Sequence, residues 1–413
     1  MGRPHRAPAR IEEGTAPVRI LHVSDCFLPR AGGIEVTVSD LAREQTARGH
    51  DVRVITLTVE PSAGRGVKTM GRAAPWVSGE DGVGVQRPSG RRLPARIRLI
   101  ATALREADTG GYDAVHAHCS TFSPLAFAMI LRTLRRSAPA PTIITVHSLW
   151  RYYTPLYRIF DILLGWRRLP IVWSAVSRCA ADAVENAAHG PLEVAVLPNG
   201  LDLSSWPGPD DHVTSDHVRL ISVMRLATRK RPLALARMLR DVRAALPHGP
   251  ALSAVIVGDG PRRAQLERYL QQHGMTGWVE ITGHLTRPDV ADHLRNADVF
   301  VAPASLESFG IAALEAHAAG LIVIGRNGTG LADYVLDGHD GRLVDDDRGM
   351  VAAIVDVVRS DAKDTARRTD RPAMEQFTWD EVTQRAEELY ALARTKVERT
   401  ASEPTTADRA EVA

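Results

Sequence analysis

The stretch "VRILHVSDCFLPRAGGIEVTVSDLAREQTARGHDVRVITL" (residues 18–57) decides the fold. It begins with a short apolar run at 18–24, passes through a glycine-containing loop into a stretch with helical spacing at 34–48, and ends in a second apolar run at 51–57. Two such runs on either side of one amphipathic helix indicate a strand-helix-strand unit with parallel strands.

The same alternation of apolar runs and helix-length segments continues along the chain. Because the runs are apolar on both faces, they predict parallel sheets that helices cover on both sides. The predicted fold class is therefore α/β, with two facing Rossmann-like, doubly wound domains and an interdomain cleft that holds the ligand. Further strands are expected at 112–118, 141–147, 171–177, 193–198, 218–224, 252–260, 278–283, 299–303, 321–325 and 341–344.

A segment rich in Pro, Gly, Asn, Asp and Ser, residues 198–216, has the composition of a linker between the two domains. Both ends of the chain are polar and small, which favours disorder. The predicted segments are a disordered arm (1–17), a first domain (18–200), a second domain (201–378), a closing helix (379–397) and a disordered tail (398–413).

Composition narrows the class of protein. With 51 Lys and Arg against 49 Asp and Glu, the net charge is only +2, which argues against a nucleic-acid partner. Cys26, Cys119 and Cys179 form no close pair, so we expect reduced thiols without a disulfide framework or metal site. No secretory signal and no apolar run of about 18 residues occurs, and we expect a cytoplasmic protein.

Two glutamates stand in "SLESFGIAALEAHAAG" (residues 305–320), an otherwise apolar helical stretch. Taking an unpaired carboxylate out of water costs several kcal/mol, so Glu315 needs a partner. Side chains on a helix lean toward its N-terminus, where Glu315 could accept two hydrogen bonds from a sugar diol. The alternative is that Glu307 complements the helix dipole and Glu315 pairs with a core arginine.

The start of this helix predicts an anion site. We expect Ser308 to cap a helix that begins near Phe309, which leaves the amides of Phe309, Gly310 and Ile311 pointing at a phosphate. A nucleotide sugar supplies both a phosphate and a diol.

Two cations follow a strand in "VMRLATRKRP" (residues 223–232). We expect the strand to end at Arg225 and a helix to start at Lys230, which delivers both charges to one crevice. Fixed cations there would stabilise the charge that develops on a leaving diphosphate. The alternative is that both side chains belong to a solvated face.

Glycines and histidines mark the same edge of the first domain. Gly32 and Gly33 precede a helix, where the backbone can approach a ligand, although the pair could equally form a simple turn. His118 and His147 end two predicted strands, and imidazoles there can hydrogen-bond sugar hydroxyls. His116 is expected to be a buried core histidine.

Three aspartates at 345–347 could suggest a cation site. They follow a short strand in a turn near the end of the fold, where acidic surface loops are common, and we predict no metal and no cofactor.

An aromatic and basic stretch occupies residues 149–173, and a second cluster of arginines occupies 87–98. Together they suggest peripheral contact with the inner face of a membrane or a lipid-linked acceptor. The alternative, which the usual packing of amphipathic helices favours, is a core helix with a solvated basic face. The arginines of the second cluster are Arg87, Arg91, Arg92, Arg96 and Arg98.

These motifs together resemble those of the retaining glycosyltransferases of family 4 with the GT-B fold, from residue 18 to 396. Several of them agree in order with the family pattern. The matching residues are Gly32, Gly33 and Glu35, His118, Asn199 and Gly200, Arg225 and Lys230, Gly258 to Pro261, and the pair Glu307 and Glu315.

The resemblance implies roles for these residues. In the second domain, Arg225 and Lys230 would bind the diphosphate of a nucleotide sugar and Glu315 its ribose. The first domain would bind the acceptor. Glu307 and the amides of Phe309 to Ile311 would surround the sugar, and the base would lie near Gly283 and His284. Gly33 would lie near the reacting centre, and His118 would touch the donor sugar. Gly32 and His147 would lie on the acceptor side.

Three departures from the family pattern border the donor pocket. Met224 and Arg231 replace glycines beside Arg225 and Lys230, and "GTGLADYV" stands where the family commonly has "GGIPEVV". The identity of the donor therefore stays open.

The function that we predict is retaining transfer of a hexosyl group (mannose, glucose or N-acetylglucosamine type) from a UDP or GDP sugar to an acceptor hydroxyl. The acceptor would be a glycolipid, an inositol-type molecule or another alcohol, and the resemblance implies a metal-independent reaction. The alternatives are a sugar-nucleotide epimerase or hydrolase and a non-catalytic sugar-nucleotide sensor of the same fold.

Overall fold

The computed structural model describes residues 16–30, 32–59, 76–79, 81–88, 90, 92–135, 139–206, 217–249, 251–360 and 374–402. Its contacts divide the chain into two units, Met1–Gly200 with Trp379–Ala413 and Leu201–Thr378. Most of the predicted arm, and the tail from residue 403, lie outside the described residues, as do Arg91 and part of the predicted linker.

The first unit is built on an eight-stranded sheet with the order β3-β4-β2-β1-β5-β6-β7-β8. Its strands pair in parallel except for β3 and β4, which are antiparallel. These two short strands were not predicted. The strands are β1 (Arg19–Ser24), β2 (Asp51–Thr56), β3 (Val77–Ser78), β4 (Gly84–Gln86), β5 (Ala114–Cys119), β6 (Thr142–Val146), β7 (Ile171–Ala175) and β8 (Val194–Val196).

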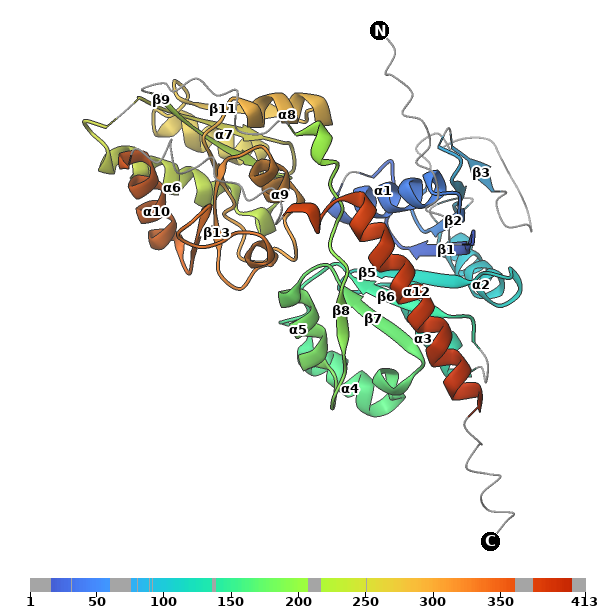
Figure 1. Ribbon diagram of the computed structural model, residues 1–413. Helices are drawn as coiled ribbons and strands as arrows, with labels where there is room; N and C mark the ends of the chain where they lie inside the picture. The colour runs from blue at the N-terminus through green and yellow to red at the C-terminus, as the bar shows by residue number, and fades with distance from the viewer. Residues whose placement is uncertain are drawn as a thin grey trace. The chain divides into compact units, whose positions relative to one another are not determined.

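Helices cover this sheet, and the last of them comes from the far end of the sequence. Helix α12 (Trp379–Ser402) lies along β5, β6 and β7 and against α1 (Gly33–Ala47), as Figure 1 shows. The predicted end at residue 397 was wrong, because the sequence contains no proline before residue 404 to stop the helix. The other helices are α2 (Leu93–Thr109), α3 (Pro124–Arg135), α4 (Thr154–Leu164) and α5 (Arg178–Ala187).

The second unit is built on a six-stranded parallel sheet with the order β11-β10-β9-β12-β13-β14. Numbered within the unit this is 3-2-1-4-5-6, the order of dinucleotide-binding Rossmann domains. The predicted class of two doubly wound parallel-sheet units is confirmed. The strands are β9 (His217–Val223), β10 (Ala251–Val257), β11 (Val279–Gly283), β12 (Val299–Val301), β13 (Ile322–Arg326) and β14 (Gly341–Val344), and the helices are α6 (Pro232–Ala245), α7 (Arg263–Gln272), α8 (Arg287–Arg295), α9 (Ile311–Ala318) and α10 (Asp347–Arg359).

Strand order fixes where each unit can bind a ligand. In doubly wound sheets the crevice lies outside the carboxyl ends of the two strands from which the chain winds in opposite directions. These strands are β1 and β5 in the first unit and β9 and β12 in the second. The residues that follow these four strands are therefore the first to consider.

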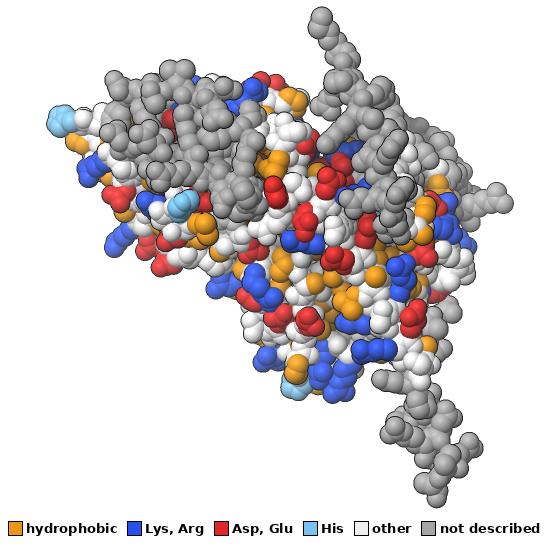
Figure 2. Space-filling model, in the orientation of Figure 1, with side chains coloured by type: hydrophobic (Ala, Val, Ile, Leu, Met, Phe, Trp, Pro, Cys, Tyr) orange, Lys and Arg blue, Asp and Glu red, His pale blue; other side chains and the backbone are white. Residues whose placement is uncertain are grey.

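Charges are mixed over the surface. On the face drawn in Figure 2, Lys and Arg side chains are interspersed with Asp and Glu, which agrees with the small net charge. None of the described helices combines the length and apolar character that crossing a membrane requires.

Candidate functional site

In the second unit, the loop after β9 carries a cation, Arg225, that has no partner among the described residues. Strand β9 ends at Val223, two residues before the predicted end at Arg225. The Arg225 side chain is exposed, and within the described chain its guanidinium makes no hydrogen bond or ion pair. An unpaired guanidinium beyond the carboxyl end of a switch-point strand is available to an anionic ligand.

Lys230 reaches the neighbouring strand's loop. It ends a short 3-10 helix (Thr228–Lys230), and its Nζ donates to the Oε2 of Glu307, which follows β12. Both side chains are largely buried, with 25% and 17% of their area exposed. The structure therefore brings Lys230 and Glu307 together at the switch point.

Arg231 explains one departure from the family pattern. Its φ of 59° and ψ of 43° are left-handed, a conformation that costs a residue with a Cβ about 1 kcal/mol and that glycine adopts freely. Its guanidinium donates to both carboxylate oxygens of Asp347 at 2.8 and 2.9 Å and to the carbonyl of Pro303 at 3.1 Å. These bonds offset the backbone cost. They also place the strain directly beside Lys230.

The acidic run at 345–347 is bound by protein groups. Asp347 pairs with Arg231 and Arg326. Asp346 caps α10 by accepting from the amide of Gly349, and Asp345 accepts from Asn327 at 2.7 Å. This run serves the packing of the unit.

The loop before α9 differs from the prediction. Helix α9 begins at Ile311, and its N-cap is Gly310 with a φ of 88°, so Ser308 is not the cap. The left-handed turn at Gly310 delays the helix by two residues. The Tyr334 hydroxyl holds this turn by donating to the carbonyls of Phe309 and Gly310, at 3.0 and 2.9 Å.

The first turn of α9 still offers amides to an anion. The amides at a helix start have no intrahelical partner, and the helix dipole favours negative charge there. The ring of Phe309 is buried against Tyr334, so Phe309 could contribute only its backbone.

Glu315 is buried on α9, 7% exposed, and does have a protein partner. Arg287, at the start of α8, approaches its Oε1 with both Nε and Nη2 at 3.4 Å. These contacts are long, and the Arg287 side chain is 46% exposed. The pair resembles the alternative considered for Glu315, except that the arginine lies at the surface and not in the core.

A glycine turn closes this edge of the sheet. Gly258 and Gly260 have φ values of 132° and 157°, and a Cβ on Gly258 would lie 1.9 Å from the carbonyl oxygen of Met224. The turn thus packs against the Arg225 loop. Gly283, with a φ of 79°, bonds through its carbonyl to the amide of Gly258 at 2.8 Å, and His284 beside it is exposed.

In the first unit, the glycine loop after β1 already holds a carboxylate. Gly32 is the N-cap of α1, which begins at Gly33, and a Cβ on Gly32 would lie 2.3 Å from Oε2 of Glu35. Glu35 is buried and pairs with Arg30 at 3.1 Å. Because its own carboxylate folds over this helix start, the loop suits a neutral ligand better than a phosphate.

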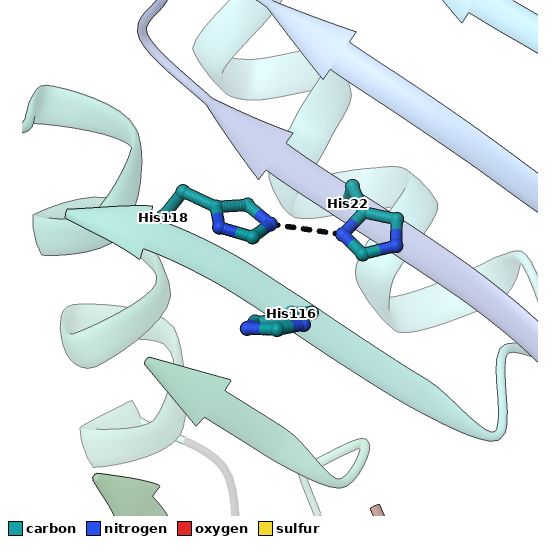
Figure 3. A group of neighbouring side chains, drawn as sticks. All are labelled: His22, His116 and His118. Atoms are coloured by element: carbon teal, nitrogen blue, oxygen red, sulfur yellow. Dashed lines mark hydrogen bonds between the residues drawn. The ribbon is translucent and has the colours of Figure 1, made fainter. Parts of the chain in front are cut away.

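The histidines at the ends of β5 and β6 belong to a buried row that also contains His22. Figure 3 shows the bond between His22 and His118. His118 Nε2 lies 2.9 Å from Nδ1 of His22 on β1, and His118 Nδ1 lies 3.0 Å from Nε2 of His147. His118 is 2% exposed and uses both ring nitrogens within the protein. A direct bond from this ring to a sugar would require one of these bonds to break.

His116 is fully buried, as predicted, and belongs to a second row. Its Nδ1 lies 3.0 Å from the hydroxyl of Tyr390 on α12, and its Nε2 lies 2.6 Å from Oγ1 of Thr145. The Tyr390 hydroxyl also accepts from Nε2 of Gln45 at 2.8 Å, and Gln45 Oε1 lies 2.7 Å from His22. Gln45 and Tyr390 therefore join the two rows.

Burial keeps these histidines neutral. It lowers the pKa of His22 and of His147 from 6.5 to about 4, and for His22 the hydrogen bond to Gln45 opposes the effect. Burial and the neighbouring histidines hold the pKa of His116 and His118 well below the ordinary value. At neutral pH each ring therefore has one protonated and one unprotonated nitrogen.

Three of these rings lie so close together that they could in principle share a metal ion. Nitrogens of His22, His116 and His118 lie within 4.8 Å of one another. However, the His116 and His118 rings stack at 4.3 Å, whereas ligating imidazoles point their nitrogens at one common centre. Each of the three rings also bonds to protein groups through both nitrogens, so the set fits a hydrogen-bonded stack.

A narrow pocket lies beside this row. Its walls combine His118 and His147 with Thr37 of α1, and the hydroxyl of Thr37 donates to Oδ1 of Asn199 at 3.0 Å. The walls are thus neutral hydrogen-bonding groups among apolar ones. Leu41, Thr145, Leu197, Pro198, Trp379 and Val382 complete the lining.

Sequence reasoning missed His22, Gln45, Tyr390, Thr37 and Arg287. His22 carried a signal, because it lies in a central strand and pairs in register with His116. The alternating histidines of the next strand could have suggested a polar face. Gln45 and Tyr390 are 345 positions apart, and no local pattern connects them.

Two family descriptions match the chain. "Glycosyltransferase Family 4" matches residues 31–205, which include the buried histidines at 116, 118 and 147. "Glycosyl transferases group 1" matches residues 211–373, which include the loops after β9 and β12.

Individual proteins are similar over most of the chain. The gpi3 subunit of phosphatidylinositol N-acetylglucosaminyltransferase from Schizosaccharomyces pombe is 25% identical over 373 residues, 89% of this chain and 79% of that protein. The D-inositol 3-phosphate glycosyltransferase of Jonesia denitrificans is 26% identical over 391 residues, 85% of this chain and 88% of that protein. The structure of sucrose-phosphate synthase from Thermosynechococcus elongatus has the same fold, with a TM-score of 0.71 at 19% identity over 91% of this chain and 98% of that one.

Proposed function

Because the chain belongs to the glycosyltransferases of family 4 and group 1, we propose that it moves a hexosyl group from a UDP or GDP sugar to an acceptor hydroxyl with retention of configuration. The observation that carries the proposal is the switch point of the second unit. There, the carboxyl ends of β9 and β12 are surrounded by the Lys230 and Glu307 pair, the first turn of α9 and Arg225, which has no partner in the part of the chain that the structure describes.

The donor would bind at this switch point through its diphosphate and its ribose. Arg225 and Lys230 would hold the diphosphate, and the amides at the start of α9 would add neutral donors. Glu315 would accept from the ribose hydroxyls. The base would lie against Gly283, where the missing side chain allows close approach, and near exposed His284.

The acceptor would bind to the first unit, at the neutral groups that follow β1, β5 and β6. Hydroxyls suit this edge, because its histidines are uncharged and Glu35 already occupies the start of α1. The names of the relatives from S. pombe and J. denitrificans include a phosphatidylinositol and an inositol phosphate, which supports an inositol-type or glycolipid acceptor.

In the proposed reaction the bond between the anomeric carbon and the phosphate oxygen breaks as the bond to the acceptor oxygen forms. The leaving phosphate takes the acceptor proton, and Arg225 and Lys230 stabilise its charge. With two fixed cations for the diphosphate, we propose that neither a metal nor an organic cofactor is needed.

Product analysis with a panel of UDP and GDP sugars tests this function. We expect a new glycoside, with an inositol or phosphatidylinositol as the first acceptors to try, formed equally well in EDTA. Proton NMR of the product should show the anomeric configuration of the donor. Free sugar without an acceptor would indicate a hydrolase, an isomerised nucleotide sugar an epimerase, and binding without turnover a sensor.

Replacing Glu315 with glutamine should weaken donor binding by about 10-fold to 100-fold, because hydrogen bonds to a charged group contribute about 1.5 to 3 kcal/mol. Calorimetry with the nucleotide sugar, or with its nucleotide alone, measures the effect. Glu280→Gln, at an exposed glutamate of β11, is the matched control and should bind normally. Equal affinity in the Glu315 variant would refute the ribose assignment.

The exposed apolar side chains of helix α4 support the proposal that the protein acts at a membrane surface. Of the residues of this helix, all of which the structure describes, only Asp161 is buried. The Asp161 carboxylate accepts from the amides of Arg167 and His189 at 3.0 and 2.8 Å and pairs with the Arg167 side chain. The helix is therefore anchored by Asp161 and by Tyr157, whose ring stacks on buried Trp150 at 3.8 Å, and the alternative of a core helix does not describe its aliphatic side chains.

The apolar side of α4 faces solvent. Leu156, Ile159, Ile162 and Leu163 are 36 to 72% exposed, and Tyr152 just before the helix is 74% exposed. Segment 151–168 holds four arginines against the one aspartate, a balance that suits anionic lipid headgroups. We propose that this surface rests on an anionic membrane, which would present a lipid-linked acceptor.

The double variant Ile159→Asp and Leu163→Asp should lose binding to anionic vesicles. Each buried aliphatic side chain contributes about 2 kcal/mol, so we expect partitioning to fall by at least about 100-fold. Flotation at low and high salt measures it, with Leu392→Asp on α12, 46% exposed, as the control. Failure of the wild type to bind at low salt, or a dimer that the double variant dissociates, would contradict the proposal.

A further inference from the structure

Gln45 and Tyr390 connect the buried histidines in a way that fixes where their protons lie. The amide of Gln45 has Oε1 at 2.7 Å from His22 Nε2 and donates from Nε2 to the Tyr390 hydroxyl at 2.8 Å. An amide oxygen can only accept and an amide nitrogen can only donate. The Gln45 side chain thus determines which atom donates and which accepts in every hydrogen bond of both rows.

The direction of the first row follows step by step. Because Gln45 Oε1 only accepts, the proton of His22 is on Nε2 and its Nδ1 is an acceptor. His118 must therefore donate to it from Nε2, which leaves His118 Nδ1 as an acceptor. His147 in turn donates from Nε2, and its Nδ1 carries no proton.

The second row obeys the same rule. The Tyr390 hydroxyl receives a hydrogen bond from Gln45, so its own proton goes to Nδ1 of His116. His116 then donates from Nε2 to Oγ1 of Thr145, whose proton goes to Oγ of Ser174 at 2.6 Å. All four histidines arrive at the same tautomer, with the proton on Nε2. Rotating the Gln45 amide by half a turn would reverse every one of these bonds.

We propose that Gln45 and Tyr390 are positioning residues that hold His22, His116, His118 and His147 in the Nε2-protonated form. This order gives His147, which lines the pocket at the end of β6, an Nδ1 that can only accept a hydrogen bond. Any group that contacts this nitrogen, whether from the protein or from a ligand, must therefore be a donor such as a hydroxyl, and a phosphate or carbonyl oxygen does not qualify. The expected effect of this order on catalysis rests on the proposed function, whereas the proton order itself does not.

Nitrogen NMR of the full chain with labelled histidine tests the proton order directly. Near neutral pH, all four rings should show a protonated Nε2 and an unprotonated Nδ1, with each signal assigned by replacing one histidine at a time. A protonated Nδ1 on any of the four would overturn the order. This measurement needs no substrate, so it stands even if no transferase activity is found.

Tyr390→Phe tests the positioning role, because it removes the hydroxyl that joins the rows and keeps the buried ring. We expect mixed tautomers and a kcat lowered by about 10-fold to 100-fold, as for a small misplacement of a reacting group, with an unchanged donor KM. The matched control is Thr383→Val, also buried on α12, whose hydroxyl makes no hydrogen bond within the described chain. Altered tautomers with normal kcat, or lowered kcat with unaltered tautomers, would overturn the role.

Discussion

Lys230→Ala is expected to lower kcat by about 100-fold to 1,000-fold, the loss typical of removing one fixed donor from developing charge in a transition state. In the proposed reaction negative charge grows on the diphosphate as its bond to the sugar breaks, so the Lys230 ammonium would stabilise the transition state more than the bound donor. The KM for the donor should therefore change much less than kcat. Steady-state kinetics with a saturating acceptor measure both.

The ion pair with Glu307 predicts a second effect. Without Lys230, the carboxylate of Glu307 would lose this partner and, in the proposed complex, would repel the diphosphate. The double variant Lys230→Ala and Glu307→Gln should recover part of the lost rate, provided that Glu307 has no further role. Arg229→Ala, at an exposed neighbour in the same turn, should leave kcat unchanged. A raised KM with normal kcat in Lys230→Ala would show that Lys230 only binds.

The sheets could be predicted because their signal is local. Strands such as β1, β10 and β13 have five to seven residues, most of them apolar and buried, as burial on both faces of a parallel sheet requires. Strands β3 and β4 have two and three residues at the edge of the sheet, and no period can be recognised at that length. The strand order of the second unit then places Arg225, Lys230 and Glu307 together at the carboxyl edge of its sheet.

The details of the site depend on conformations that the pattern does not reveal. Ser308 has the residue type of a helix cap, but the left-handed turn at Gly310 moves the helix start past it. Helix α4 has an ordinary amphipathic pattern, and its orientation is set by the bonds of Asp161 to Arg167 and His189 and by the stacking of Tyr157 on Trp150. Both the inward orientation of Asp161 and the link between Gln45 and Tyr390 depend on contacts between residues that are far apart in the sequence.

Acid should unfold the first unit between about pH 6.5 and pH 4, while its buried histidines take up protons. The pKa of His22 and His147 falls from 6.5 in an unfolded chain to about 4 in the structure. Between these values the unfolded chain binds more protons, so the free energy of unfolding decreases as the pH falls. Each of the two contributes about 3 kcal/mol, His116 and His118 act in the same direction, and whole domains are stable by only about 5 to 15 kcal/mol.

Tryptophan fluorescence can follow this transition, because five of the seven tryptophans lie in the first unit. Asp25 opposes the effect, since burial raises the pKa of its carboxyl, but it is one group against four. Replacing exposed His189 with glutamine should leave the midpoint unchanged, whereas His22→Gln, which keeps a hydrogen-bonding side chain, should flatten the dependence of stability on pH. A first unit that stays folded below pH 4, or a slope that His22→Gln does not reduce, would mean that these histidines are protonated in the folded protein. The neutral row on which the proton order depends would then not exist.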